Sequence, residues 1–443
     1  MKPIHLSLLV SLALMSTIAS AQTTGYAPVN GMKMYYEVHG KGDPVIVLHG
    51  AYMTIEGPIR SFVNELAKTR QVIVVETQGH GRTADIERDI TYESMADDVA
   101  ALIRHLKLDS VDVFGYSMGG GTALQFAIRH PKMLRKLVVT SASYTSDGVY
   151  PELWQFIPMI TPEVFEGSPF KKEYDSIAPN PANFPKLVER LKKLDMQPFD
   201  WGAENIKAIK SPTLIIIGDA DIVKPEHAVE MLQLLGGGVV GDMAGIPASQ
   251  LAILPGTSHL GVMERLTTLE SMVTTFLDAP MPGTTYDVIV TRVFDAPIKD
   301  VWNAWVKPEK VKQWLGPNGF TCPVAEMDVR VGGTSLVCMR APAEFGGMDM
   351  YNTWTYTAIV PNERMEYIFR FTDKDRNVKL PQELGLPTGI PGEVPHVVTF
   401  KSLASNKTEV TVTESGYTNL AVVAQSRMGM EQCLEKMAGM LVK

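Results

Sequence analysis

From about residue 26 to residue 260 the chain alternates between two hydrophobic patterns. Short apolar runs rich in valine, isoleucine and leucine have the length of buried strands, and segments such as residues 91–108 and 120–131 space their apolar residues three and four apart, as a helix does. The apolar runs are residues 33–40, 44–50, 71–82, 110–117, 134–142, 211–221 and 250–259. Apolar strands separated by helices predict an α/β fold with a mainly parallel sheet covered on both faces, and the loops beyond the carboxyl ends of its strands are the expected place for chemistry.

The pattern changes after a stretch rich in proline and glycine at residues 278–285. From residue 286 apolar and polar residues alternate, as is typical of antiparallel strands. Helical spacing follows at residues 297–316, and the last segment, residues 421–443, has the pattern of an amphipathic helix. A curved sheet around one long helix would enclose an apolar cavity. We therefore expect an α/β domain at residues 22–278, a linker at residues 279–285 and an α+β domain at residues 286–443.

Residues 1–21 have the pattern of a signal peptide. Lys2 places a positive charge near the amino terminus, residues 6–18 are largely apolar, and the small residues 19–21 form a cleavage site. The apolar run is shorter than the roughly 20 residues that a membrane span requires, which favours a cleaved signal over a membrane anchor. We expect a mature chain that begins at Gln22 and is exported, to the periplasm or the medium.

Charge and cysteine content exclude several classes of protein. The formal net charge is −8, and no basic stripe offers a surface for nucleic acid, so we expect no nucleic-acid partner. The three cysteines, Cys322, Cys338 and Cys433, form no C-x-x-C pair; buried free thiols are favoured over one disulfide between Cys322 and Cys338. The nine histidines have no metal-ligand spacing, so we expect neither a metal nor another cofactor.

A glycine-rich turn, GYSMGGG at residues 115–121, carries the first catalytic candidate. Ser117 follows an apolar run and precedes a helical pattern, which is the arrangement of a nucleophile elbow. Gly115 and Gly119 suit such a tight turn because larger side chains there would collide with the neighbouring strand or helix. The amino end of the helix favours negative charge that develops beside the serine. The turn therefore predicts that Ser117 is a nucleophile.

A serine nucleophile needs a base, and the base needs a carboxylate that orients it. His259 follows the last apolar run of the first domain, and Asp219 and Asp221 both lie at the end of the run before it. Along the chain the serine comes first, the two aspartates second and the histidine last. These residues are the candidates for a catalytic triad.

The loop after the second apolar run is a candidate for stabilising an oxyanion. His49 in this loop is interpreted as shaping it rather than as moving protons. We expect the backbone N–H groups of Ala51 and Met118 to be the two donors. Of the other histidines, His80 is expected in a loop and His227 on a helix surface.

Residues 26–278 resemble the α/β-hydrolase superfamily of the AB hydrolase-1 type. The resemblance lies in the motifs VLHG, QGHGRT, GYSMGGG, AIRHPKMLRKLVV, GDADIV and PGTSHLG, which occur in the family's order. It implies that Asp221, three residues after Gly218, is the acid in place of Asp219. A departure is Glu76, where many relatives have aspartate.

The same resemblance implies that residues of about 144–205 form a cap over the site. The cap is rich in aromatic side chains, which either line an apolar substrate pocket or pack the cap onto the core. These side chains are Tyr150, Trp154, Phe156 and Phe165.

Residues 286–443 resemble the SRPBCC, or START-like, helix-grip domains, in the branch of the heat-shock ATPase activator homologues (AHSA-type). The resemblance lies in residues 292–320, 326–333 and 351–367 and in the last helix. It implies a hydrophobic ligand pocket. A chaperone partner is not expected, because a signal peptide would separate the protein from a cytosolic chaperone. The tryptophans of this half are expected in the core and not against a ligand; they are Trp302, Trp305, Trp314 and Trp354.

The expected function is therefore that of an exported serine hydrolase. Its substrate would be an ester, thioester or lactone, small to medium in size and partly apolar, and the second domain would bind an apolar ligand. Two alternatives stay open. One is hydrolysis of a carbon–carbon bond, or cofactor-free perhydrolysis, by the same triad, and the other is a ligand-binding protein without catalysis.

Overall fold

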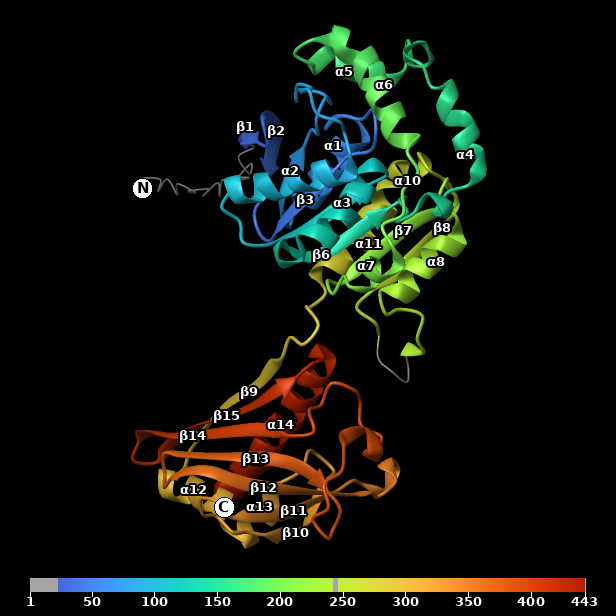
Figure 1. The fold of residues 1–443 in the computed structure, drawn as a ribbon. Coiled ribbons are helices and arrows are strands. Elements are labelled where there is room, and N and C mark those ends of the chain that lie inside the picture. Colours follow the sequence, from blue (N-terminus) through green and yellow to red (C-terminus); the bar gives the residue numbers. More distant parts are fainter. Residues whose placement is uncertain (1–22, 242–245, 443) are drawn as a thin grey trace, which may run out of the picture. The chain divides into compact units, whose positions relative to one another are not determined.

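The computed structural model describes residues 23–241 and 246–442, and it divides into two compact units between Pro280 and Met281 (Figure 1). The expected signal peptide, residues 1–21, lies outside the described residues. Among the described helices, none is long and apolar enough to cross a membrane.

The first unit is built on a sheet of eight described strands in the order β1-β2-β4-β3-β5-β6-β7-β8. The strands are β1 Thr23–Val29, β2 Met32–His39, β3 Pro44–Leu48, β4 Gln71–Val75, β5 Val111–Tyr116, β6 Leu134–Thr140, β7 Thr213–Ala220 and β8 Gln250–Ser258. The strands from β4 to β8 run parallel, and β1 and β2 are antiparallel at one edge. The predicted mainly parallel sheet is confirmed.

Strand β1 is absent from the sequence prediction. Its residues include Gly25 and Pro28, which weaken a strand pattern. The strand is tolerated because, among the described strands, it lies at the sheet edge and pairs with β2 alone.

Helices cover both faces of this sheet. The helices of the unit outside its cap are α1 Pro58–Leu66, α2 Tyr92–His105, α3 Met118–Arg129, α7 Ala203–Lys207, α8 Pro225–Leu234, α10 Gly261–Glu264 and α11 Leu266–Asp278, with short 3-10 turns η1 Pro131–Met133 and η2 Ser146–Gly148. In β3, Ile46 and Leu48 pack with α2, α3 and α8, whereas Val45 and Val47 pack with α1, α10 and α11. Alternate residues thus enter two separate cores, which is why the strand is apolar throughout.

The cap connects β6 to β7. It comprises α4 Pro151–Phe156, η3 Ile157–Met159, η4 Pro162–Phe165, α5 Pro169–Ile177, η5 Pro181–Asn183 and α6 Phe184–Asp195. Two isolated bridges, Thr145 with Asp200 and Val149 with Val223, tie its base to the sheet unit. The apolar face of α6 packs toward Met118 at the start of α3, so the cap lies over the carboxyl edge of the sheet.

The second unit is an antiparallel sheet of seven described strands in the order β10-β11-β12-β13-β14-β15-β9. The strands are β9 Tyr286–Phe294, β10 Thr321–Glu326, β11 Thr334–Arg340, β12 Asp349–Val360, β13 Arg364–Thr372, β14 Val394–Ala404 and β15 Lys407–Tyr417, and the helices are α12 Ile298–Val306, α13 Pro308–Trp314, η6 Ala343–Phe345, η7 Pro381–Leu384 and α14 Leu420–Leu441. The long helix α14 packs against the sheet, as a helix-grip fold requires.

The core of the second unit agrees with most of the sequence prediction. All four of its expected core tryptophans are buried in one apolar cluster with side chains of α14. The expected single helical segment at 297–316 is two helices, because Pro308 cannot continue the hydrogen bonding of α12. The three cysteines, Cys322, Cys338 and Cys433, are free and buried.

Candidate active site

Three side chains from the carboxyl ends of neighbouring strands meet at one point. Ser117 follows β5, Asp221 follows β7 and His259 follows β8. His259 Nε2 lies 2.9 Å from Ser117 Oγ, and His259 Nδ1 lies 2.7 Å from Asp221 Oδ1. Because a carboxylate can only accept, Nδ1 carries the proton and Nε2 is left to accept the proton of the serine hydroxyl. The three candidates predicted from the sequence are thus brought into one hydrogen-bonded chain.

The turn at Ser117 explains the glycines around it. Ser117 has φ 56° and ψ −118°, a left-handed conformation that is strained for a residue with a side chain. A Cβ on Gly115 would overlap the carbonyl oxygen of Gly119, and a Cβ on Gly119 would overlap that of Leu48. The strand and the helix can therefore approach closely enough to hold Ser117 at the sheet edge only with glycine at both positions.

Asp221 is held on both of its oxygens. It is 5% exposed, and besides His259 it accepts hydrogen bonds from Ser141 Oγ (2.6 Å) and from the N–H groups of Gly218 (3.3 Å) and Val223 (3.4 Å). Burial alone would raise the pKa of Asp221, but the hydrogen bonds from His259 and Ser141 outweigh it, so the pKa is lowered. The carboxylate therefore stays ionised and keeps the imidazole oriented.

The rival acid, Asp219, has a different position. It accepts from the N–H groups of Gly256 (2.9 Å) and Thr257 (3.0 Å) and so braces the end of β8. These two backbone donors lower its pKa. Asp219 is exposed and has no hydrogen bond to His259 among the described contacts.

Ser141 is a site residue that the sequence analysis missed. It follows β6, has a positive φ of 53°, and donates from Oγ to Asp221. Its position directly after a buried parallel strand could have indicated a site residue. Serine is common in loops, however, and no motif around Ser141 distinguishes it from other loop serines.

The loop of residues 49–57, which we name the His49 loop, lies beside the serine. Ala51 and Met118, the predicted oxyanion donors, both line the cavity that contains Ser117. His49 is fully buried, and burial lowers its pKa to about 4, so its ring is neutral. Its Nε2 accepts from Thr77 N–H (3.2 Å), and its Nδ1–H therefore donates to the Gly50 carbonyl (2.8 Å). This bond fixes the backbone next to Ala51.

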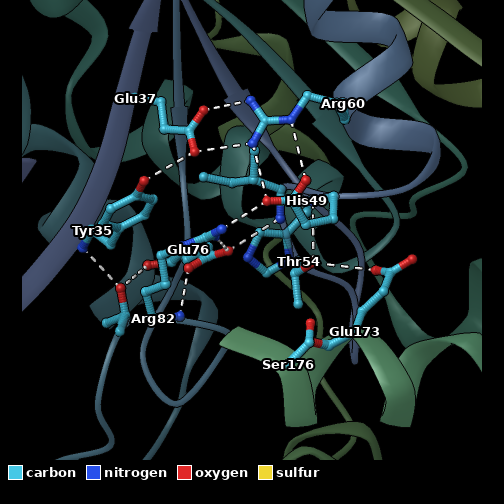
Figure 2. A network of polar contacts seen from close by, with 12 residues as sticks. Tyr35, Glu37, His49, Thr54, Arg60, Glu76, Arg82, Glu173 and Ser176 are labelled. Carbon is cyan, nitrogen blue, oxygen red and sulfur yellow. Dashed lines mark hydrogen bonds and ion pairs between the residues drawn. The ribbon is translucent and has the colours of Figure 1, made fainter. Parts of the chain in front are cut away.

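A charged network lies beside the His49 loop and supports it (Figure 2). Glu76 is fully buried and accepts from Arg82 Nη1 (2.8 Å) and from Ile55 N–H (3.3 Å), while Arg82 Nη2 also reaches Glu56 (2.7 Å). Burial outweighs these hydrogen bonds and raises the pKa of Glu76 to about 6. The glutamate that departs from the family pattern thus links the loop after β4 to the His49 loop.

The His49 loop is also tied to the cap, as Figure 2 shows. Thr54 Oγ1 donates to Glu173 on α5 (3.2 Å) and accepts from the N–H of Glu56 (3.1 Å). One threonine hydroxyl therefore connects the expected oxyanion loop with the cap helix α5.

The space between the cap and the sheet is a mostly apolar cavity of about 640 Å³. Ser117 and His259 open into it from the sheet side. Of the aromatic cap residues named from the sequence, three line the cavity and Tyr150 does not; the three are Trp154, Phe156 and Phe165. Among the described lining residues there is no lysine or arginine.

The expectation that His227 lies on a helix surface is wrong. His227 is buried on the inner face of α8, where its ring lies 4.7 Å from the ring of Tyr144 and its Nδ1 lies 3.2 Å from Glu230. The helical pattern around it is short and offered no clear apolar face. His80 is in a loop, as expected, and is fully buried.

The second unit has a cavity of its own, of about 300 Å³. Most of its lining is apolar, but one end is polar. There Glu414 accepts from Tyr417 Oη (2.6 Å) and Ser426 Oγ (2.8 Å), and its other oxygen lies 3.8 Å from His396 Nε2. No set of side chains suited to a metal ion is found among the described residues of either unit.

Family models match both units. Residues 43–189 match the model described as alpha/beta hydrolase fold, and residues 295–442 match the model described as activator of Hsp90 ATPase homolog 1-like protein. The two matches agree with the two resemblances found in the sequence: the first unit has an α/β-hydrolase fold, and the second unit matches an AHSA1-type domain.

Individual relatives resemble the first unit. A 2-hydroxy-6-oxo-2,4-heptadienoate hydrolase of Pseudomonas putida is 35% identical over 129 residues, which are 27% of this chain and 46% of the relative. An AB hydrolase superfamily protein of Bacillus subtilis is 25% identical over 279 residues, which are 55% of this chain and 94% of the relative. The solved structure of a meta-cleavage product hydrolase from Pseudomonas fluorescens covers 58% of this chain and 97% of its own at 20% identity, with a TM-score of 0.47.

Proposed function

We propose that the first unit is a serine hydrolase that cleaves an ester, thioester or lactone through an acyl-enzyme. The observation that carries the proposal is the hydrogen-bonded chain from Ser117 through His259 to Asp221, at the floor of an apolar cavity. A strained nucleophile, a base in the correct tautomer and a buried carboxylate are the parts that acyl transfer requires.

The mechanism follows from the donors and acceptors. His259 Nε2 takes the proton of Ser117 Oγ as that oxygen attacks the carbonyl carbon, and the amides of Ala51 and Met118 bind the resulting oxyanion. His259 then gives its proton to the leaving alcohol or thiol. A water molecule, deprotonated by the same nitrogen, then attacks the acyl carbon. The bond from that carbon to Ser117 Oγ breaks, His259 returns the proton to this oxygen, and the acid leaves. Asp221 stabilises the imidazolium in both steps.

Charge in the cavity favours ester chemistry over the carbon–carbon bond cleavage considered above. The substrate in the Pseudomonas putida relative's name is a dienoate, which carries a carboxylate. A carboxylate in an apolar cavity needs a cationic partner, and no lysine or arginine is among the described lining residues. A substrate without negative charge fits this cavity better.

The test is covalent labelling of the purified protein by a fluorophosphonate probe. We expect the wild type to be labelled and Ser117→Ala to lose the label, because only a serine activated by its base attacks the phosphorus atom. A folded wild type that takes up no label would contradict the proposal and would favour the ligand-binding alternative.

For the second unit we propose binding of an apolar ligand. The support is its cavity of about 300 Å³, whose polar end is formed by Glu414 and His396. Gly429 on α14 lines this cavity, whereas Gly439 on the same helix is exposed with open space around it.

These two glycines give a matched pair for testing the second cavity. Gly429→Phe would fill the cavity, so we expect it to reduce binding of the neutral dye Nile red to the full chain, while Gly439→Phe leaves binding unchanged. Binding is measured from the rise in dye fluorescence. Equal binding by the two variants and the wild type would rule out this cavity as a ligand site.

We also propose, from residues 1–21, that the protein is exported and works without a cytosolic chaperone as partner. Amino-terminal sequencing of the protein recovered from the periplasm or medium is expected to begin at Gln22. A chain found only in the cytoplasm with Met1 in place would refute export.

A further inference from the structure

Asp195 is an ionisable group in the active-site cavity that the triad does not use. It is the last residue of the cap helix α6 and lines the cavity into which Ser117 opens. Within residues 23–241 and 246–442 its carboxylate has no hydrogen bond and no ion pair. The two lysines in the last turn of α6 have other partners: Lys192 donates to the carbonyl of Pro158, and Lys193 pairs with Asp89.

Stability does not account for an acid at this position. The carboxyl end of a helix disfavours negative charge, and an apolar surrounding disfavours any charge without a partner. Burial alone raises the pKa of Asp195 to about 7. None of the described contacts brings a cation or a hydrogen-bond donor to the carboxylate to offset this cost. The carboxylate can therefore take a partner that enters the cavity.

Two tyrosines that line the same cavity lie within electrostatic reach of Asp195. Tyr52 in the His49 loop has a positive φ of 62°, and its ring lies 4.6 Å from that of Phe165 on the cap. Its hydroxyl is buried without a described partner. Tyr92, at the start of α2, also lines the cavity. For both hydroxyls burial raises the pKa, and the charge of Asp195 raises it further. The field of Asp195 therefore extends to both tyrosines.

We propose that Asp195, with the rings of Tyr52 and Tyr92, is a recognition site for an ammonium group on the substrate. This inference rests on the proposed hydrolase function and names its substrate class: esters or thioesters that carry a cation away from the scissile carbonyl. Aromatic faces attract cations, and a carboxylate supplies the opposite charge. The absence of lysine and arginine from the described lining leaves no competing cation.

The experiment compares two isosteric thioesters with the same acyl group. One is the S-acylthiocholine, and the other is the S-(3,3-dimethylbutyl) thioester, in which carbon replaces the charged nitrogen. Thiol release gives kcat and KM at pH 8, where Asp195 is ionised. The variants are Asp195→Asn and the control Asp175→Asn. Asp175 is an exposed cap residue paired with Lys171 outside the cavity.

We expect the wild type to prefer the thiocholine ester by about tenfold in kcat/KM, the size of one cation–π or charge contact. Asp195→Asn should remove the preference through KM for the charged substrate, leaving kcat/KM for the neutral one within about twofold. Asp175→Asn should behave as the wild type. Equal losses on both substrates in Asp195→Asn, or a wild type that prefers the neutral thioester, would overturn the inference.

A binding measurement separates this inference from the proposed function. Calorimetric titration of Ser117→Ala and of Ser117→Ala/Asp195→Asn with the same two thioesters needs no turnover. Preferential binding of the charged thioester that disappears in the double variant supports the ammonium site, even where the wild type cleaves neither compound and the hydrolase proposal fails. Cleavage without preferential binding keeps the hydrolase and refutes the ammonium site.

Discussion

Asp221→Asn is expected to lower kcat by about 10⁴-fold, with little change in KM. Asparagine presents an N–H group as well as an oxygen, so the imidazole of His259 is no longer held with its proton on Nδ1. The neutral ring then offers Ser117 a donor where an acceptor is required. Steady-state hydrolysis of a neutral ester measures the effect.

Asp219→Asn is the matched control for this prediction. Asp219 lies two residues away and its described hydrogen bonds come only from backbone N–H groups at the end of β8, so its variant should keep kcat within about threefold of the wild type. A result in which Asp219→Asn loses as much activity as Asp221→Asn would mean that the acid has been assigned to the wrong residue. Circular dichroism of both variants shows that each has folded.

Gly115→Ala is expected to destabilise the first unit by about 3 kcal/mol or more, because the new methyl group, carried by β5, overlaps backbone atoms of Gly119 and Gly120 in α3. Backbone cannot move aside as a side chain can, so the strand and helix must separate. Urea unfolding followed by fluorescence measures the change in the free energy of unfolding.

Gly167→Ala in the cap provides the comparison. Gly167 has a positive φ of 77° with open space around it, so alanine there meets backbone strain of only about 1 kcal/mol. If Gly115→Ala unfolds at the same urea concentration as the wild type, then close approach is not the reason for glycine in this turn.

The sequence was most informative where a reactive side chain directly follows the apolar pattern of a buried strand. Ser117 and His259 each follow a run of apolar residues, and the strand ends of a parallel sheet meet at one edge, so their proximity could be predicted. Asp221 could be chosen over Asp219 only through the resemblance to a family. The structure separates the two by their partners, since one contacts an imidazole and the other contacts backbone amides.

Other features needed the fold. Ser141 is an ordinary serine in sequence, and its contact with Asp221 spans 80 positions along the chain. Asp195 ends a helix rich in lysines, and this pattern predicts a solvated residue. Asp195 lines the cavity only because the cap lies over the sheet. Strand β1 was missed because edge strands tolerate the residues that interrupt the pattern of inner strands.

The order of the strands determines which part of the active site is lost first when the first unit begins to unfold. Ser117 follows β5, which has neighbours on both sides, whereas His259 follows β8, which among the described strands is the outermost and pairs only with β7. Outer strands fray at a lower free energy than central ones, since fewer hydrogen bonds and contacts must break. Partial unfolding at this edge would displace His259 while Ser117 stays in place. Catalytic activity would therefore be lost before the hydrophobic core unfolds.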